Sequence, residues 1–261
     1  MQESHSNILL CTTQDHVTTV SLNRPQQLNA LSNALRAAIT ETFLRLREDD
    51  DTWVIILTGV GRGFSAGLDL KELGQAGLRS GGVSSADLQS AVTGVGKPII
   101  AAINGFAITG GFELALMCDI LIASPEARFA DTHVRMGVVP GWGLSQRLAH
   151  LIGVSRAKEL SFSGNYLDAE TAERWGLVNR VVPADELLNH CQKLALDICS
   201  ADPLTLQTVH QLIDYGSQHT LAEGLAEAQK RSLAHTGDVS ANKLEARRLS
   251  VQARGRLQQR D

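Results

Sequence analysis

The sequence predicts a mixed α/β fold followed by a purely helical region. Short apolar, β-branched runs recur between residues 8 and 182, and stretches with helical spacing of apolar side chains separate them. Beyond Pro203 no run of strand character remains, and residues 204–216, 221–234 and 240–252 have helical patterns. We therefore divide the chain into a core over residues 1–198 and a C-terminal helical region over residues 199–261.

Composition narrows the class of protein. The 261 residues are 43% apolar and 20% charged, which is typical of a soluble globular protein. A net charge of −4 gives no basic surface for nucleic acid or for an anionic membrane. No apolar run approaches the roughly 18 residues of a membrane span, and the N-terminus lacks the pattern of a signal peptide. Four cysteines without a CxxC pair predict a reduced, cytoplasmic protein without a zinc site, with Cys118 as a small core residue.

The first hundred residues alternate strand and helix patterns. Ser32 is a suitable N-cap for the first helix, because Leu35, Ile39 and Phe43 follow it with helical spacing. The expected elements are strands Ile8–Leu10 and Val17–Leu22 around a Thr-Gln-Asp turn, the helix from Ser32, a buried strand Trp53–Thr58, a helix over LDLKEL, a mobile Gly- and Ser-rich loop Gly74–Ser85, and a helix Ala86–Val95.

The stretch from Ile99 to Asp119 joins a strand to a helix through glycines. Ile99–Ile103 is an apolar run, Gly110-Gly111 marks a turn, and Phe112–Cys118 has helical character. Glu113 lies in the first helical turn. Glycines just before a helix let free N–H groups point at a ligand, and the helix dipole adds positive potential there. This junction therefore suits an anion, or a carbonyl that becomes one.

The rest of the core continues the alternation. The expected elements are a strand Ile120–Ala123, a segment Phe129–Val138 leading into the backbone-permissive loop 139–143, helices Leu144–Ile152, Arg156–Ser161 and Asp168–Trp175, the last capped by Asp168, a strand Val178–Val182, and a helix Asp185–Ile198.

The glycine-rich segment 61–67 fits two short catalytic patterns. Residues 61–66 match the dinucleotide fingerprint G-x-G-x-x-A, but the next strand ends at Asn104 rather than at an acidic residue. Residues 63–67 match the nucleophile elbow G-x-S-x-G around Ser65, with His133 and either Asp119 or Asp131 available for a triad. An elbow needs its serine at the tip of the strand, and residues 60–63 intervene here.

A third interpretation uses both glycine-rich junctions together. Each runs from strand through a permissive loop to a helix, and each offers an N–H group, from Ala66 in the first and from Gly110 in the second. Two convergent N–H donors form an oxyanion hole, each contributing about 3–4 kcal/mol to a transition state with oxyanion character. A thioester that loses its α-proton becomes such an enolate. Glu113 follows Gly110 by about one helical turn, where it suits general acid–base catalysis.

Five motifs in consistent order resemble the enoyl-CoA hydratase/isomerase (crotonase) superfamily: LNRPQQLNAL, RGFSAGLDLKEL, INGFAITGGFELALMCDI, PGWGLSQRL and SGNYLDAETAERWGLVNRVVP. The resemblance covers residues 8–235. It implies a crotonase-like spiral of ββα units, a C-terminal helical region for trimerisation, a homotrimer or a hexamer made of two trimers, and an acyl-CoA thioester as substrate. It also implies fatty-acid metabolism such as β-oxidation, and no cofactor or metal beyond the coenzyme A of the substrate.

The resemblance also implies site residues. Ala66 and Gly110 match the oxyanion hole, and the segments that match the binding site of coenzyme A contain Gln26, Gln27, Leu28, Gly67, Leu68, Asp69 and Lys71. Gly141 and Trp142 lie where the acyl chain is expected, and Trp142 replaces a small residue, so that it would narrow the pocket or fill the core.

One position departs from the family pattern. Hydratases of the family carry two glutamates, one matching Glu113 and the second matching His133. Three outcomes follow: His133 acts as base or holds the water, Asp131 reaches the site from two residues away, or Glu113 works alone as in family isomerases and decarboxylases. Hydration of a 2-enoyl-CoA is the expected reaction. Isomerisation, decarboxylation, a serine hydrolase using Ser65, and a CoA-binding scaffold without turnover are the alternatives.

Overall fold

A computed structural model describes residues 8–76, 85–236 and 241–258. The chain divides into two compact units, Met1–Ala201 and Asp202–Asp261. The boundary lies three residues later than the one predicted from the sequence, after residue 198. The first unit holds every strand among the described residues and every predicted site residue. Within the described part of the chain, no helix is both long enough and apolar enough to cross a membrane.

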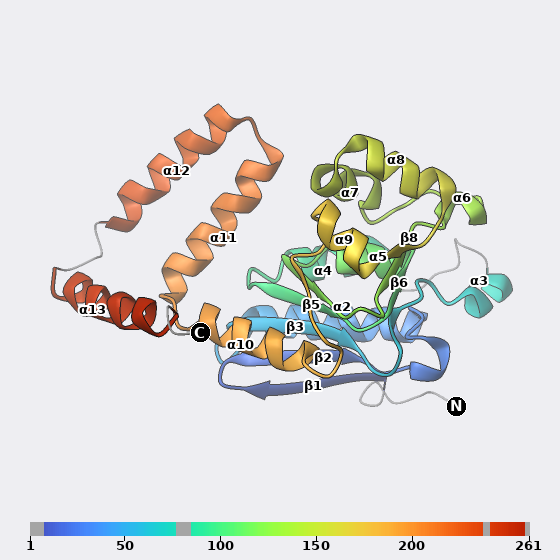
Figure 1. The fold of residues 1–261 in the computed structure, drawn as a ribbon, viewed down its shortest axis with the longest axis horizontal. Coiled ribbons are helices and arrows are strands. Elements are labelled where there is room, and N and C mark those ends of the chain that lie inside the picture. The colour runs from blue at the N-terminus through green and yellow to red at the C-terminus, as the bar shows by residue number, and fades with distance from the viewer. Residues whose placement is uncertain (1–7, 77–84, 237–240, 259–261) are drawn as a thin grey trace. The chain divides into compact units, whose positions relative to one another are not determined.

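A six-stranded sheet forms the base of the first unit (Figure 1). Its spatial order is β1-β2-β3-β5-β7-β10, with β1 antiparallel to β2 and the other neighbours parallel. The strands are β1 Leu9–Gln14, β2 Val17–Leu22, β3 Val54–Gly59, β5 Ile99–Ile103, β7 Ile120–Ala123 and β10 Arg180–Val181.

A second, four-stranded sheet has the order β4-β6-β8-β9, in which β9 alone is antiparallel. Its strands are β4 Gly63–Ser65, β6 Phe106–Ile108, β8 Arg128–Ala130 and β9 Leu167–Asp168. Three times the chain runs from the large sheet into the small one and then into a helix, which is the ββα repeat that the resemblance implies. The sequence patterns did not predict β4, β6 or β9. They placed most of β8 in one segment with the residues that follow it, Phe129–Val138.

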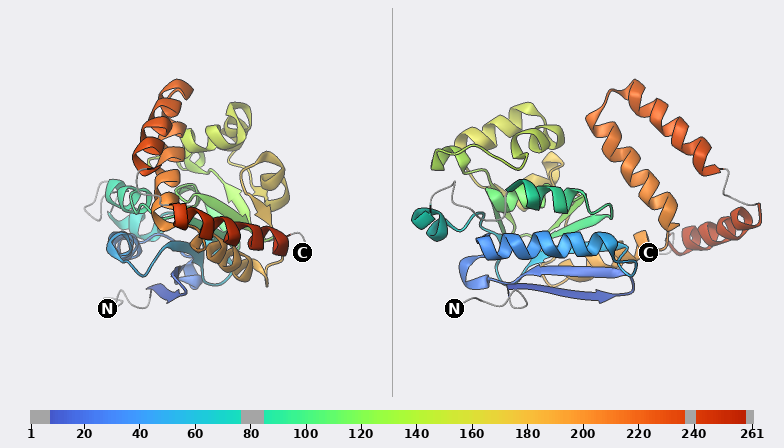
Figure 2. Two further views of the ribbon diagram at one scale, coloured as in Figure 1. Left: turned by 90° about the vertical axis from the view of Figure 1, so that its left-hand side faces the viewer. Right: turned by 180° about the vertical axis from the view of Figure 1, so that it is seen from behind.

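Helices cover both faces of the large sheet. Ile55 and Leu57 of β3 pack with the core that includes α2 and α4, whereas Val54 and Ile56 pack with the core that includes α10. This alternation explains why the whole of β3 is buried. Figure 2 shows α2 and α4 side by side along the sheet. The helices of this unit are α2 Asn33–Glu48, α3 Leu70–Ala76, α4 Ser85–Thr93, α5 Gly110–Ala115, α6 His133–Met136, α7 Leu144–Ile152, α8 Val154–Ser163, α9 Ala169–Trp175 and α10 Leu187–Cys199, with the 3₁₀ turn η1 Pro25–Gln27.

Several local predictions are confirmed. Ser32 caps α2 by accepting the N–H of Leu35 at 3.2 Å, and Asp168 caps α9 by accepting that of Thr171 at 2.8 Å. Cys118 is buried in the core, and all four cysteines are free. The first turn lies later than expected, at Asp15 and His16, both with positive φ. The predicted mobile loop falls largely on residues 77–84, which lie outside the described residues.

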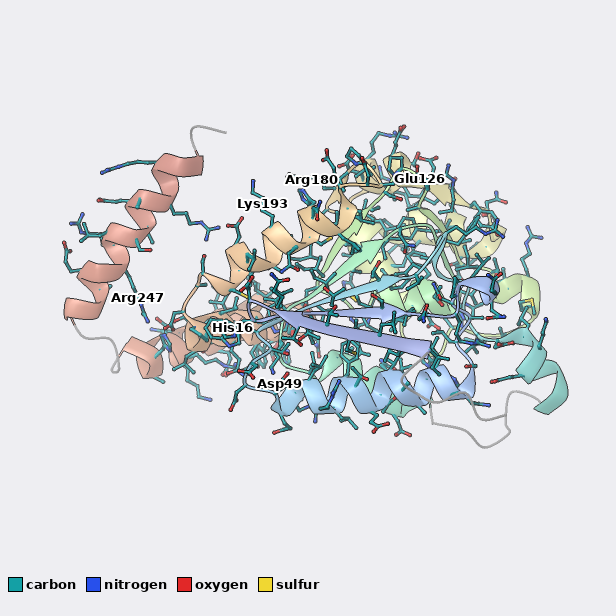
Figure 3. The ribbon with its side chains drawn as sticks, turned by 90° about the horizontal axis from the view of Figure 1, so that it is seen from below. His16, Asp49, Glu126, Arg180, Lys193 and Arg247 are labelled. Carbon is teal, nitrogen blue, oxygen red and sulfur yellow. The ribbon has the colours of Figure 1, made fainter. Side chains whose placement is uncertain are left out.

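The turn between β1 and β2 is anchored by a ring contact. His16 stacks on Trp53 with ring centroids 4.3 Å apart, and Figure 3 labels His16 at this hairpin. Lys193 of α10 extends into solvent in the same view, as the amphipathic pattern of that helix requires.

The second unit consists of α11 Pro203–Gln218, α12 Leu221–Thr236 and α13 Ala241–Gln258. Helices α11 and α12 pack against each other, and Asp202 caps α11 by accepting the N–H of Thr205 at 3.0 Å. Arg247, labelled in Figure 3, extends from α13 and pairs with Asp202. No residue of α11 is buried.

Candidate active site

Glu113 is held at the beginning of α5 among buried groups. It is 3% exposed, and its Oε1 accepts the backbone N–H of Trp142 at 2.7 Å and that of Leu144 at 3.4 Å. These two donors come from the loop before α7 and from the first residue of that helix. They fix one carboxylate oxygen and leave Oε2 for a second partner. That partner is His133, whose Nε2 lies 3.5 Å away.

His133 occupies the first position of α6, separated by two residues from the end of β8. Its Nδ1 lies 2.6 Å from Oδ1 of Asp131, and its own backbone N–H donates to the same oxygen at 3.2 Å. Asp131 is 1% exposed and His133 is 6% exposed. The segment 131–133 is not a strand, so the expectation that two residues on one strand face the same side does not apply. Asp131 contacts Nδ1, on the side of the imidazole opposite to the Nε2 that faces Glu113. The expectation that Asp131 itself reaches the partner position of Glu113 is therefore wrong.

Hydrogen bonds and neighbouring charges shift the pKa values of His133 and Asp131. Burial alone would lower the pKa of His133, but hydrogen bonds and charge attraction from Asp131 and Glu113 outweigh burial and raise the pKa to about 9. For Asp131, burial would raise the pKa. Hydrogen bonds from His133 and Ser161 outweigh it, so that the pKa of this carboxyl lies below its usual range. Both shifts favour a protonated His133 beside an ionised Asp131.

The two glycine-rich junctions come together as expected, but with a different first donor. The N–H of Ala66 donates to the carbonyl of Leu28 at 2.9 Å, so the expectation that Ala66 supplies the oxyanion hole is wrong. The N–H groups of Leu68 and Gly110 make no hydrogen bond with any described residue. A side-chain carbon built at Gly110 would lie 3.5 Å from the nitrogen of Leu68.

Gly67 makes this approach of the two backbones feasible. Its φ is +88°, and a side-chain carbon there would lie 2.8 Å from the carbonyl oxygen of Ile108 and 3.1 Å from the nitrogen of Gly110. A larger residue would force the two loops apart. The glycine that precedes Leu68 was the sequence signal for this donor.

The segments assigned to coenzyme A lie side by side. The N–H of Leu31 donates to the carbonyl of Gly67 at 2.7 Å, which ties the turn after η1 to the loop after β4. Gln26, Gln27 and Lys71 are exposed along these segments. Asp69 is committed elsewhere: it pairs with Arg24 at 3.0 Å and accepts the N–H of Lys71 at 3.1 Å. Asp69 therefore fixes its loop.

Trp142 fills the core, as one of the two expectations has it, and the pocket-narrowing role stays a prediction. The residue is 4% exposed and belongs to the main core. Its ring also borders the candidate oxyanion hole, because Cζ3 would lie 3.5 Å from a side-chain carbon at Gly110. The neighbouring Gly141 is exposed and has open space around its Cα.

The serine-hydrolase alternative does not fit this geometry. Ser65 is fully buried, and its hydroxyl donates to the carbonyl of Asn29 at 2.9 Å. His133 is engaged by Asp131 and Glu113, so no Ser65–His133 pair forms.

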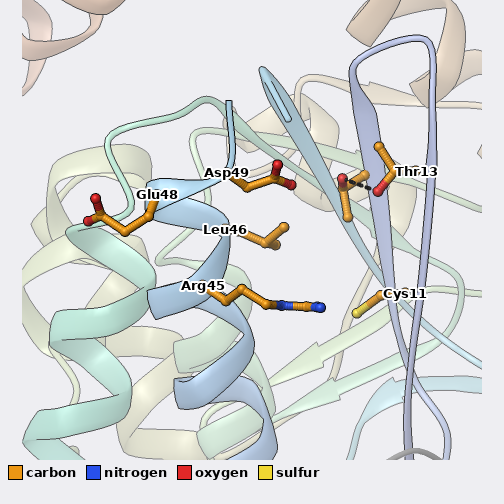
Figure 4. A pocket seen from close by; sticks show the side chains of 7 residues that line it. Cys11, Thr13, Arg45, Leu46, Glu48 and Asp49 are labelled. Carbon is orange, nitrogen blue, oxygen red and sulfur yellow. Dashed lines mark hydrogen bonds between the residues drawn. The ribbon is translucent and has the colours of Figure 1, made fainter. Parts of the chain in front are cut away.

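A hollow of about 510 Å³ lies between the end of α2 and the β1–β2 hairpin (Figure 4). It contains none of the predicted site residues. Arg45 extends toward Cys11 there, while Glu48 and Asp49 belong to the same rim. Burial raises the pKa of the Cys11 thiol, despite the opposing charge of Arg45, so Cys11 is not an activated nucleophile.

Comparison with known proteins identifies the family of the chain. The family model for enoyl-CoA hydratase/isomerase matches residues 12–249. A probable mitochondrial enoyl-CoA hydratase of Dictyostelium discoideum is 43% identical over 79% of this chain and 75% of its own length. A probable enoyl-CoA hydratase of Mycobacterium bovis is 36% identical over 94% of this chain and 95% of its own length. The crystal structure of an enoyl-CoA hydratase subunit from Geobacillus kaustophilus has a TM-score of 0.85 at 34% identity, covering 93% of this chain and 95% of that one. The chain therefore belongs to the enoyl-CoA hydratase/isomerase family.

Proposed function

We propose that the protein hydrates a 2-enoyl-CoA thioester. The observation that carries the proposal is the position of Glu113, whose oriented carboxylate lies one helical turn after the free N–H of Gly110. Relatives that align with nearly the whole chain are named enoyl-CoA hydratases. The isomerase and decarboxylase alternatives are less favoured, because relatives at 36–43% identity are named hydratases, although one solved structure at 34% identity is a monofunctional enoyl-CoA isomerase.

The proposed chemistry divides into binding of the oxyanion and transfer of a proton. The thioester oxygen receives the N–H groups of Leu68 and Gly110, which stabilise the enolate that forms when water adds to the β-carbon. Glu113 accepts the proton of the attacking water. The reaction requires no metal ion or redox cofactor, since coenzyme A enters as part of the substrate.

Glu113→Gln tests this function. We expect kcat for the hydration of crotonyl-CoA to fall by about 10²–10⁴-fold, because the amide keeps the shape of the side chain but cannot accept the proton. Loss of the double-bond absorbance of crotonyl-CoA measures the rate. Glu126→Gln, at an exposed turn, is the matched control and should keep the wild-type rate. A wild-type protein that isomerises or decarboxylates acyl-CoA without hydrating crotonyl-CoA would contradict the proposal.

The proposal extends to assembly and setting. The helices of the second unit expose large apolar side chains, including Ile213, Leu221 and Leu233, each more than half exposed in the single chain. Such a surface suits contact with further copies of the chain, as a homotrimer or as a hexamer of two trimers. We place the activity in fatty-acid β-oxidation in the cytoplasm, where a reducing environment suits the four free cysteines.

A further inference from the structure

Hydration of an enoyl thioester requires two proton transfers in one turnover. Water loses a proton as its oxygen bonds to the β-carbon, and the α-carbon gains a proton as the enolate collapses. Glu113 has one oxygen held by two N–H groups and therefore presents a single oxygen, Oε2. The group that faces this oxygen is His133 Nε2, at 3.5 Å.

The orientation of the imidazole is set from behind. Oδ1 of Asp131 accepts both the Nδ1–H and the backbone N–H of His133, so the ring is fixed to its own main chain. Because Nδ1 is committed to Asp131, Nε2 is the atom that faces Glu113. The hydroxyl of Ser161 in α8 in turn donates to Asp131, which holds that carboxylate in place.

Charge within the cluster supports one protonation state. Glu113 from α5 and Asp131 from the β8–α6 turn are the two charged side chains that act on the imidazole among the described residues. Arg135, on the same short helix, donates instead to the carbonyl of Ser163. A neutral imidazole would leave two carboxylates close together in a buried site, whereas an imidazolium compensates one of them.

We propose that Asp131 is a positioning residue that holds His133 as the acid for the α-carbon, and that Glu113 returns the water's proton to His133 after each turnover. The inference rests on the proposed hydration. As the C–O bond forms at the β-carbon, the water proton passes to Glu113 and the electron pair of the C=C bond moves onto the thioester. The enolate then takes the Nε2 proton at the α-carbon, leaving neutral His133 beside protonated Glu113. Transfer of that proton from Oε2 to Nε2 restores the starting state without a further reactant.

The pH dependence of kcat/KM tests the pair. The wild-type rate should fall at high pH around 9, where His133 loses its proton. In Asp131→Asn the carboxylate that favours the imidazolium is absent. The pH at which the rate falls, called here the high-pH limb, should therefore decrease by at least ~1 unit toward the ordinary histidine value of ~6.5. In His133→Gln, kcat should fall by about 10²–10⁴-fold and the limb should disappear.

A matched control separates the positioning role of Asp131 from a general effect of replacing a hydrogen-bonded aspartate. Asp168 also accepts a backbone N–H, and its pKa also lies below its usual range because of hydrogen bonds from Thr171, but it caps α9 at an exposed position. Asp168→Asn should keep the cap, because the asparagine side-chain oxygen also accepts a backbone N–H, and should leave the high-pH limb in place. Nitrogen NMR of the eight histidines, with the His133 signal identified by its loss in His133→Gln, reports the titration of His133 without turnover.

The outcomes are distinguishable. A wild-type protein without hydratase turnover overturns the proposed function, whatever the histidine titration shows. Turnover with a high-pH limb and a His133 signal that both stay fixed in Asp131→Asn overturns the positioning role while leaving the hydratase in place. A limb and a signal that move together support the inference.

Discussion

Thr109 adopts a backbone conformation that a β-branched residue rarely takes. It stands between β6 and α5 with φ 53° and ψ −112°, a conformation that costs about 1–3 kcal/mol for a residue with a side chain. Two contacts hold it there: its N–H donates to the carbonyl of Ala130 at 2.8 Å, and its hydroxyl bonds to that of Thr132. Both lead to the turn that carries His133. The strained Thr109 therefore joins the start of α5, which carries Glu113, to the turn between β8 and α6, which carries His133.

Substitution of Thr109 should reveal this strain. Thr109→Gly and Thr109→Ala both remove the hydroxyl bond, but glycine alone also relieves the backbone. We expect the glycine variant to be more stable than the alanine variant by about 1 kcal/mol, the reverse of the order at an ordinary helical position. Urea unfolding of the two variants measures the difference. An alanine variant at least as stable as the glycine variant would show that the backbone carries no strain.

Single residues differed in how far the sequence could predict them. The caps Ser32 and Asp168 were predictable because the N–H groups they accept lie within one helical turn. Ala66 was not, because the carbonyl that takes its N–H belongs to Leu28, which is distant in the sequence. The role of His133 was predicted only as one of three alternatives, since the orientation of its ring depends on packing.

At the scale of elements, Gly111 allows α5 to pack closely against β4. A side-chain carbon at Gly111 would lie 2.1 Å from the carbonyl oxygen of Ser65, so the helix lies directly against β4. The same atom at Gly110 would meet its neighbours at 3.5 Å or more, which is ordinary contact. Adjacent glycines thus have different functions: Gly111 lets two elements pack, and Gly110 leaves space in front of its N–H.

Alanine at each position should separate these functions. Gly111→Ala should destabilise the fold by about 3 kcal/mol or more, because backbone has to shift to relieve the contact. Gly110→Ala should unfold near the wild-type temperature but lose at least ~10-fold in kcat/KM, since its methyl group enters the space beside Leu68 and Trp142. Thermal unfolding and crotonyl-CoA hydration measure the two effects. Equal loss of stability in both variants would contradict this division.

Elements were predictable in proportion to their length and periodicity. The strand Ile99–Ile103 and the helix Leu144–Ile152 have the bounds that their patterns predict. Strands β4 and β6 have three residues each and lie in glycine-rich segments. Three residues cannot display a period of two, so these segments are strands through their pairing with each other and with β8, which no local pattern shows.

At the scale of the whole molecule, the second unit tests assembly. If its apolar surface joins copies of the chain, light scattering should give three or six times the 28.1 kDa mass of one chain. Leu225→Asp combined with Leu233→Asp should lower this mass, because both side chains are well exposed on α12 and would carry charge into the contact. Lys230→Ala on the same helix is the control and should leave the mass unchanged. A wild-type protein with the mass of a single chain would contradict the proposed assembly.

The connectivity of the two sheets has a consequence for synthesis. In the order β1-β2-β3-β5-β7-β10, and again in β4-β6-β8-β9, each later strand lies beyond the earlier ones. No strand has to be inserted between two that are already paired. Parallel pairings are slow to form because the chain must close a long loop before each one. Here every such loop closes onto an edge that has already left the ribosome, so both sheets can grow from their first strands while translation continues.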